Sequence, residues 1–248
     1  MNVARNVVLA SNLPESVPAT SVDRQCGSSQ QALHFAAQAV MSGTMDVVVA
    51  GGVESMSRTP MFSPVSLPRK AGLGHYMSPE LQRRYPDIEF SQFDGAEMMA
   101  KKYEISKSNL DEYALESHIR AKEASENDVF HPEIIPTEIK DAEGRGTGEM
   151  HAKDEGVRLD ATLEGIASLA PIIENGVLTP GTASQICDGS SGVIVCNDRG
   201  LKKLGVEPLA RIRHLSVVGH DPVIMLEAPI PATKQALEKA NIELNEID

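Results

Sequence analysis

The sequence contains no tryptophan, few other aromatic residues, and no apolar run long enough to cross a bilayer. A membrane-spanning helix needs about 20 consecutive apolar residues, so we expect no membrane insertion. The first residues also lack the cationic start and small-residue cleavage site of a secretory signal. Because hydrophobic residues still make up 41% of the 248 residues, the chain can bury a substantial core and should be a soluble globular protein.

Positive charge is also scarce. The net charge is -12, and no cluster of basic residues could follow a phosphate backbone. This argues against nucleic acid as a partner. The three cysteines, Cys26, Cys187 and Cys196, lack metal-ligand spacing, so we expect reduced thiols, no metal and a cytoplasmic location, with mitochondrion or peroxisome as alternatives.

The first 57 residues have the pattern of alternating strands and helices. Helical spacing marks Val3 to Leu9, and Val17 to Val22 has the composition of a short strand. A second helix follows Cys26, with its apolar face formed by Leu33, Ala36, Ala37, Val40 and Met41. A buried strand, Asp46 to Ala50, then ends at Gly51-Gly52. This predicts an α/β fold containing a βαβ unit with Cys26 at one turn.

The remaining segments predict an insertion followed by a return to the main sheet. Residues 57–93 are irregular, and the polar segment 141–160 should be a hairpin or loop. The periodic segments predict helices at Glu97 to Tyr103, Ser108 to Ala124 and Pro231 to Ala240, with strands at Gly189 to Val195 and Leu209 to Val218.

Cys26 is the candidate nucleophile. A residue between a strand and the next helix lies where open α/β sheets bind ligands. The positive end of a helix lowers a thiol pKa and stabilises an oxyanion formed nearby. The alternative from the residues alone is a small buried hydrophobic side chain.

The residues around Cys26 resemble a known family. The sequences VDRQCGSSQQA at 22–32 and DVVVAGGVESMS at 46–57 resemble the nucleophile region of thiolases, and GTASQICDG at 181–189 and PIPAT at 229–233 follow in family order. The resemblance implies a layered α-β-α-β-α fold with an inserted loop domain. It divides the chain into an N-terminal domain (1–57 and 176–200), a loop domain for CoA and acyl binding (58–175), and the start of a C-terminal domain (201–248).

The resemblance also implies a function. Thiolases are acyl-CoA acyltransferases, and the residue matching Cys26 would take the acyl group from a 3-ketoacyl-CoA or acetyl-CoA as a thioester. Arg158 and Ser184 match CoA contacts, with a solvated arginine and a helix cap as the respective alternatives. Met225 matches a pocket-lining methionine of the binding site, although most methionines fill core. CoA would be a substrate, no cofactor would be needed, and we expect a homo-oligomer.

The sequence departs from the family pattern at several places. Ser29 stands where a glycine is usual, and Ser91-Gln92-Phe93 replaces the His-Met-Gly of biosynthetic enzymes. The second departure favours a degradative, β-oxidation type of thiolase with a bulkier acyl group. The family's later acid/base motifs have no counterpart, so we expect a chain cut at both ends, with Cys187 and Cys196 as core thiols. The alternatives are a non-catalytic CoA-binding or interaction protein derived from the same fold, and a hydrolytic or redox-sensing thiol at Cys26.

Overall fold

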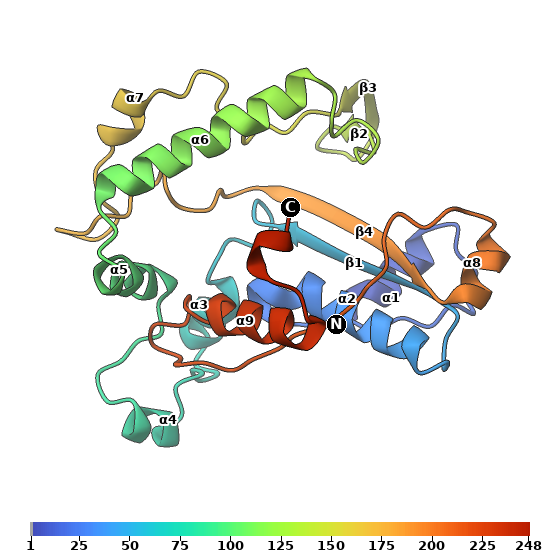
Figure 1. Cartoon of the computed structure of the whole chain (residues 1–248), viewed down its shortest axis with the longest axis horizontal. Helices are drawn as coiled ribbons and strands as arrows, with labels where there is room; N and C mark the ends of the chain where they lie inside the picture. The colour runs from blue at the N-terminus through green and yellow to red at the C-terminus, as the bar shows by residue number, and fades with distance from the viewer. Residues whose placement is uncertain (1) are drawn as a thin grey trace. The chain divides into compact units, whose positions relative to one another are not determined.

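The computed structural model describes residues 2–248 and divides into two compact units. Unit 1 contains the chain up to Ala71 together with Cys187–Val217 and Lys234–Asp248, and unit 2 contains Gly72–Ile186 and Val218–Thr233. The units are described separately below, with elements labelled as in Figure 1.

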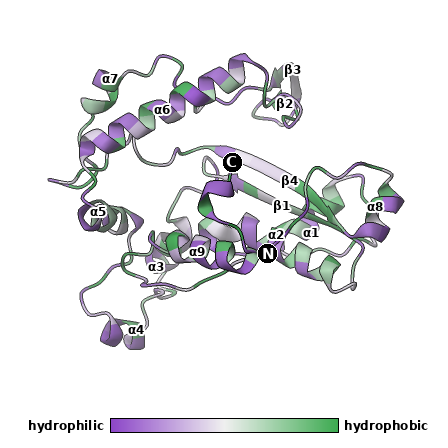
Figure 2. Ribbon diagram, in the orientation of Figure 1, coloured by the Kyte–Doolittle hydropathy of each residue, from purple (hydrophilic) through white to green (hydrophobic). Residues whose placement is uncertain are grey.

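Unit 1 is built on a long antiparallel ribbon. Strand β1 (Val47–Ser55) pairs with β4 (Asp188–Cys196) along its whole length. Helix α2 (Ser28–Met41) covers one face of this ribbon (Figure 1), and the core that it closes consists of Ala36, Ala37, Val40, Ala50 and Val195. Figure 2 shows that both strands are most apolar at the end that contributes to this core, where the start of β1 pairs with the end of β4. The small alanines allow α2 to approach the ribbon closely.

Unit 1 also contains further elements that precede, connect or follow these two strands in the chain. They are α1 (Val3–Ala10), the 3-10 turn η1 (Gln25–Gly27), α3 (Ser63–Lys70), α8 (Asp198–Leu204) and the 3-10 turn η2 (Leu244–Glu246), while α9 (Pro229–Ala240) starts in unit 2 and ends in unit 1. Asp46 joins the start of β1 to α8, because it accepts hydrogen bonds from Lys203, Asn197 and Arg199. These donors hold the pKa of Asp46 well below its usual value.

Unit 2 is mainly helical. Its helices are α4 (Pro79–Arg84), α5 (Gln92–Lys102), α6 (Lys107–Glu126) and α7 (Leu163–Ala167), and its hairpin consists of β2 (Thr137–Lys140) and β3 (Gly146–His151). Lys107 connects α6 to α7, since its ammonium group binds the buried carboxylate of Asp111 at 2.7 Å and the carbonyl of Ala167 at 2.9 Å.

Most predicted elements are present, with corrected boundaries. The helix expected at 97–103 starts at Gln92, and the helix expected from Ser108 is capped by Ser106, whose side chain forms a capping box with Asn109. The segment 141–160 does contain one strand of a hairpin, as predicted. The Ser106 side chain accepts a hydrogen bond from the Asn109 amide, so α6 begins at Lys107, one residue before the expected start.

Two predicted strands are wrong. Residues 17–22 are extended but pair with no strand; Val17 and Ala19 instead accept side-chain hydrogen bonds from Arg5 and Asn2. Residues 209–218 likewise form no strand, and are held to α9 through side chains such as Ser216 and Gln235. The predicted βαβ unit is therefore not formed within residues 2–248, because a strand needs a partner edge as well as a suitable composition.

Candidate functional site

The Cys26 turn leads directly into helix α2. Cys26 lies in η1, its thiol is exposed, and the helix begins two residues later at Ser28. Gln25 has a φ of 50°, a left-handed conformation that costs free energy for a residue with a side chain. Local hydrogen bonds hold the turn: Gln25 N donates to Asp23 Oδ1 at 2.9 Å, and the Ser28 hydroxyl donates to the Gln25 carbonyl at 2.6 Å.

The start of α2 is suited to stabilise negative charge beside this thiol. Gly27 occupies the N-cap position and offers no side-chain hydrogen bond to the first helical amides. Since these amides and the helix dipole carry partial positive charge, they can stabilise an oxyanion that forms near Cys26. Farther along the same helix, burial, and then the charge of Arg24, lower the pKa of the buried His34.

Arg158 and Ser184 belong to segments that unit 2 brings together. Gln185 donates a hydrogen bond from Nε2 to the carbonyl of Gly156 at 2.7 Å. On the other side of this segment, His118 of α6 accepts a hydrogen bond from the amide of Arg158 at 3.2 Å. Both Arg158 and Ser184 are exposed, as a contact to a solvated ligand requires. The alternative role predicted for Ser184 is wrong, because no helix starts there.

Met225 lies in a turn that is anchored to helix α5. Its φ is 24°, and its amide donates to the carbonyl of Asp221 at 3.0 Å. Gly95 of α5 packs against the turn so closely that a Cβ atom there would lie 3.0 Å from the Ile224 carbonyl oxygen. The turn is half-buried at Met225 and buried at Ile224, so the methionine is only partly a core residue.

A buried carboxylate follows two residues later. Glu227 accepts hydrogen bonds from Lys102 Nζ at 2.5 Å, from the Tyr103 hydroxyl, and from His220 Nε2 at 2.7 Å. These donors, Lys102 foremost, lower the pKa of Glu227 to about 2, so the carboxylate is charged at neutral pH. We call Lys102, Tyr103, His220 and Glu227 the Glu227 cluster.

Helix α5 also holds the segment that leads to Ser184. The carboxylate of Glu97 accepts hydrogen bonds from the amides of Val177 at 2.9 Å and Leu178 at 3.0 Å. No role for Glu97 or Glu227 was expected from the sequence. The signal available was weak, because a glutamate in a helix or loop is normally a solvated residue.

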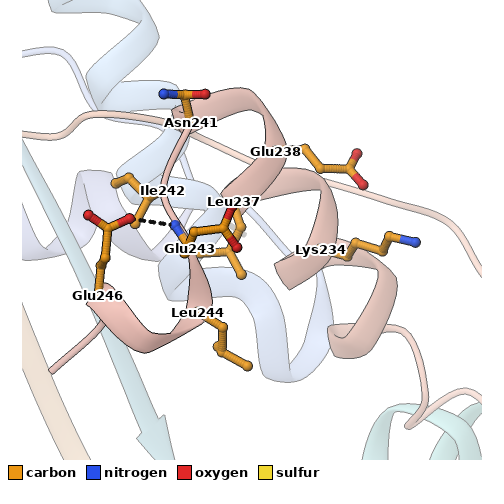
Figure 3. A pocket seen from close by; sticks show the side chains of 8 residues that line it. All are labelled: Lys234, Leu237, Glu238, Asn241, Ile242, Glu243, Leu244 and Glu246. Carbon is orange, nitrogen blue, oxygen red and sulfur yellow. Dashed lines mark hydrogen bonds between the residues drawn. The ribbon is translucent and has the colours of Figure 1, made fainter.

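None of these side chains lines the hollow formed by α9, η2 and the residues between them (Figure 3). This hollow measures about 470 Å³. Three glutamates and one lysine line it, namely Glu238, Glu243, Glu246 and Lys234. This excess of negative charge does not suit an anionic ligand such as CoA. Within residues 2–248, no group of three or more His, Cys, Asp or Glu side chains is arranged to hold a metal ion, and no helix could span a membrane.

Comparison with known proteins identifies the family. Residues 1–199 match the family described as "Thiolase, N-terminal domain", and residues 206–248 match "Thiolase, C-terminal domain". The chain belongs to the thiolase family. A steroid 3-ketoacyl-CoA thiolase of Mycobacterium tuberculosis is 45% identical over all of this chain and 59% of its own length, and a 3-ketoacyl-CoA thiolase of Salmonella typhimurium is 39% identical over 61% of its length.

Solved thiolase structures confirm the α/β fold. The human mitochondrial 3-ketoacyl-CoA thiolase superposes on 99% of this chain and 62% of its own, with a TM-score of 0.82 and 34% identity. The acetyl-CoA acetyltransferase of Bacillus anthracis gives a TM-score of 0.83 over 100% of this chain and 63% of its own, also with 34% identity. The chain thus spans about three fifths of the thiolases that it matches.

The structure accounts for one departure from the thiolase pattern. A Cβ atom at Gly52 would overlap the hydroxyl of Ser29, so the side chain of Ser29 occupies the space that a glycine leaves open in β1. The first turn of α2 therefore still packs closely on the ribbon, because the residue without a side chain at this contact is Gly52 of β1 and not residue 29 of α2. The other two cysteines differ from expectation: Cys187 is exposed, and Cys196 is half-buried at the end of β4.

Proposed function

We propose that this chain carries the acyl-accepting part of a thiolase that cleaves 3-ketoacyl-CoA, with Cys26 as nucleophile. The observation that carries the proposal is the exposed Cys26 thiol at the uncapped start of α2, in a chain that matches the thiolase family. The names of the relatives support a 3-ketoacyl-CoA substrate. The division into an N-terminal domain (1–57 and 176–200), a loop domain (58–175) and the start of a C-terminal domain (201–248) belongs to this proposal.

The chemistry of the first half-reaction follows from the residues present. The Cys26 thiolate attacks the 3-keto carbon, and the resulting oxyanion is stabilised by the amides at the start of α2. Collapse breaks the bond between carbons 2 and 3, which leaves an acyl thioester on Cys26 and an acetyl-CoA enolate that takes up a proton from water before it is released as acetyl-CoA. The thiol of a second CoA then attacks the thioester, releases the shortened acyl-CoA and returns the thiol of Cys26.

The remaining binding roles extend the proposal. Arg158, in an exposed position beside the Ser184 segment, supplies positive charge for the nucleotide end of CoA. Ser184 contacts the pantetheine arm, and Met225 contacts the acyl group. We propose a bulky acyl group, because Ser91-Gln92-Phe93, at the start of α5, replaces the His-Met-Gly of biosynthetic enzymes, and because one relative is named a steroid thiolase. Homo-oligomerisation and a cytoplasmic location are parts of the same proposal.

Intact-mass analysis after incubation with acetoacetyl-CoA tests the nucleophile. We expect one acetyl adduct on the unmodified chain, none on Cys26→Ala, and an unchanged adduct on Cys187→Ala, which removes the other exposed cysteine. Circular dichroism establishes that each sample is folded. Absence of the adduct from folded protein would overturn the catalytic proposal, and CoA binding by that sample would identify the chain as a non-catalytic CoA-binding protein.

A further inference from the structure

Two contacts, one near each end of helix α5, hold the Met225 turn. Near the start of the helix, the missing side chain of Gly95 allows the backbone at Ile224 to pack directly against it. At its end, Lys102 and Tyr103 both bind the carboxylate of Glu227. The turn between these attachments contains Met225 in a left-handed conformation that its side chain disfavours.

The Glu227 cluster ties this turn to α5 through a buried charge. The side chain of Glu227 is only 8% exposed and engages three donors, so the loss of its charge would leave Lys102, Tyr103 and His220 without a charged acceptor. His220, the third donor, precedes Met225 in the sequence, whereas Glu227 follows it. Glu227 therefore closes the segment 220–227 on itself and attaches it to α5 with one carboxylate.

We propose that Glu227 is a positioning residue, which holds the Met225 turn against α5 and thereby determines the length of acyl group accepted. This inference rests on the proposed function, because it uses the role of Met225 in the acyl pocket. The charge of Glu227 does not act on the reacting atoms. Its effect is to keep the backbone of the turn, and with it the side chain of Met225, in one place.

The test compares Glu227→Gln with Asp111→Asn. Glutamine preserves the shape of the glutamate and removes its charge. Asp111 is the matched control, since its carboxylate is 3% exposed and also binds a lysine of unit 2, but anchors α6 rather than the Met225 turn. A third variant, Tyr103→Phe, removes one donor and keeps the ion pair with Lys102.

Adduct formation on Cys26 is followed with acetoacetyl-CoA and with 3-ketodecanoyl-CoA. We expect Glu227→Gln to lower the long-to-short rate ratio about tenfold, because the longer acyl chain meets more of the displaced turn. Tyr103→Phe should lower the ratio less, and Asp111→Asn should leave it unchanged. A general loss of folded protein would reduce both rates equally and leave the ratio constant, so an unchanged ratio in Glu227→Gln overturns the proposal.

Hydrogen exchange supplies a second measurement that needs no activity. The amides of Met225 and Ala228 are hydrogen-bonded within the turn, to the carbonyls of Asp221 and Met225. We expect their exchange to accelerate in Glu227→Gln and not in Asp111→Asn; equal rates in both variants would overturn the positioning role. If the unmodified chain forms no adduct, the proposed function and the role in acyl selection both fail, while exchange still decides whether Glu227 holds the turn.

Discussion

The Cys26 turn and the Met225 turn both contain a non-glycine residue at positive φ, but they are stabilised in different ways. Gln25 is held by Asp23 and Ser28, within four residues in the sequence. Met225 is held by Gly95 and by residues that bind Glu227 from 124 and 125 positions away. The first turn is therefore encoded locally, whereas the second also depends on long-range contacts with α5.

Removing the long-range support from α5 should give the largest effect on stability. In Glu97→Ala the amides of Val177 and Leu178 lose a charged acceptor, and we expect a loss of about 2 kcal/mol in the free energy of unfolding of unit 2. Hydrogen exchange at these two amides measures the local effect. Glu116→Ala, which removes an exposed helical ion pair of the same unit, is the control and should change little. Equal losses of stability in the two variants would show that the Glu97 contact supports unit 2 no more than an exposed ion pair does.

The contact between Ser29 and Gly52 tests the packing beneath the Cys26 turn. We expect Gly52→Ala to cost about 1 kcal/mol, because the added methyl group meets the side chain of Ser29 and forces it to move. The double variant Ser29→Gly with Gly52→Ala should recover most of this loss. Urea denaturation of the four proteins of this cycle gives the coupling energy. Additive effects would mean that the two side chains do not share the same space.

The charge that anchors the Met225 turn should make its stability depend on pH. The pKa of Glu227 is lowered from 4.5 to about 2, so its stabilisation is complete above about pH 4.5 and is lost as the pH falls toward 2. Stability of unit 2 measured across this range should therefore fall more steeply for the unmodified chain than for Glu227→Gln. Parallel pH profiles would contradict the role of the charge.

The smallest effect should come from relieving local strain before Cys26. Gln25→Gly permits the φ of 50° without a Cβ penalty, although glycine also adds entropy to the unfolded chain. We expect a net gain of about 0.5 kcal/mol or less in thermal unfolding experiments. The Met225→Gly change at the other turn provides the comparison, and there the lost methionine packing should outweigh the relieved strain. A large loss in Gln25→Gly would show that its side chain, rather than local hydrogen bonds, holds the turn.

Periodicity and local chemistry predicted α2, β1, β4 and α9, because these elements carry their own apolar patterns and end at recognisable residues. The predictions were wrong where pairing decides the outcome. Residues 17–22 and 209–218 have the composition of strands, but their hydrogen bonds go to side chains of α1 and α9 or to residues just before them. The antiparallel pairing of β1 with β4 joins segments more than 130 residues apart, and no local pattern encodes it.

For the candidate site, the sequence alone determined the family and the position of Cys26, since a nucleophile at a helix start is defined by adjacent residues. It also named Arg158, Ser184 and Met225. Only the tertiary structure showed that α5 supports the segments of Ser184 and Met225 through Glu97, Gly95 and the Glu227 cluster. The physical reason is that a buried carboxylate depends on its partners, and folding brings those partners to it from distant parts of the chain.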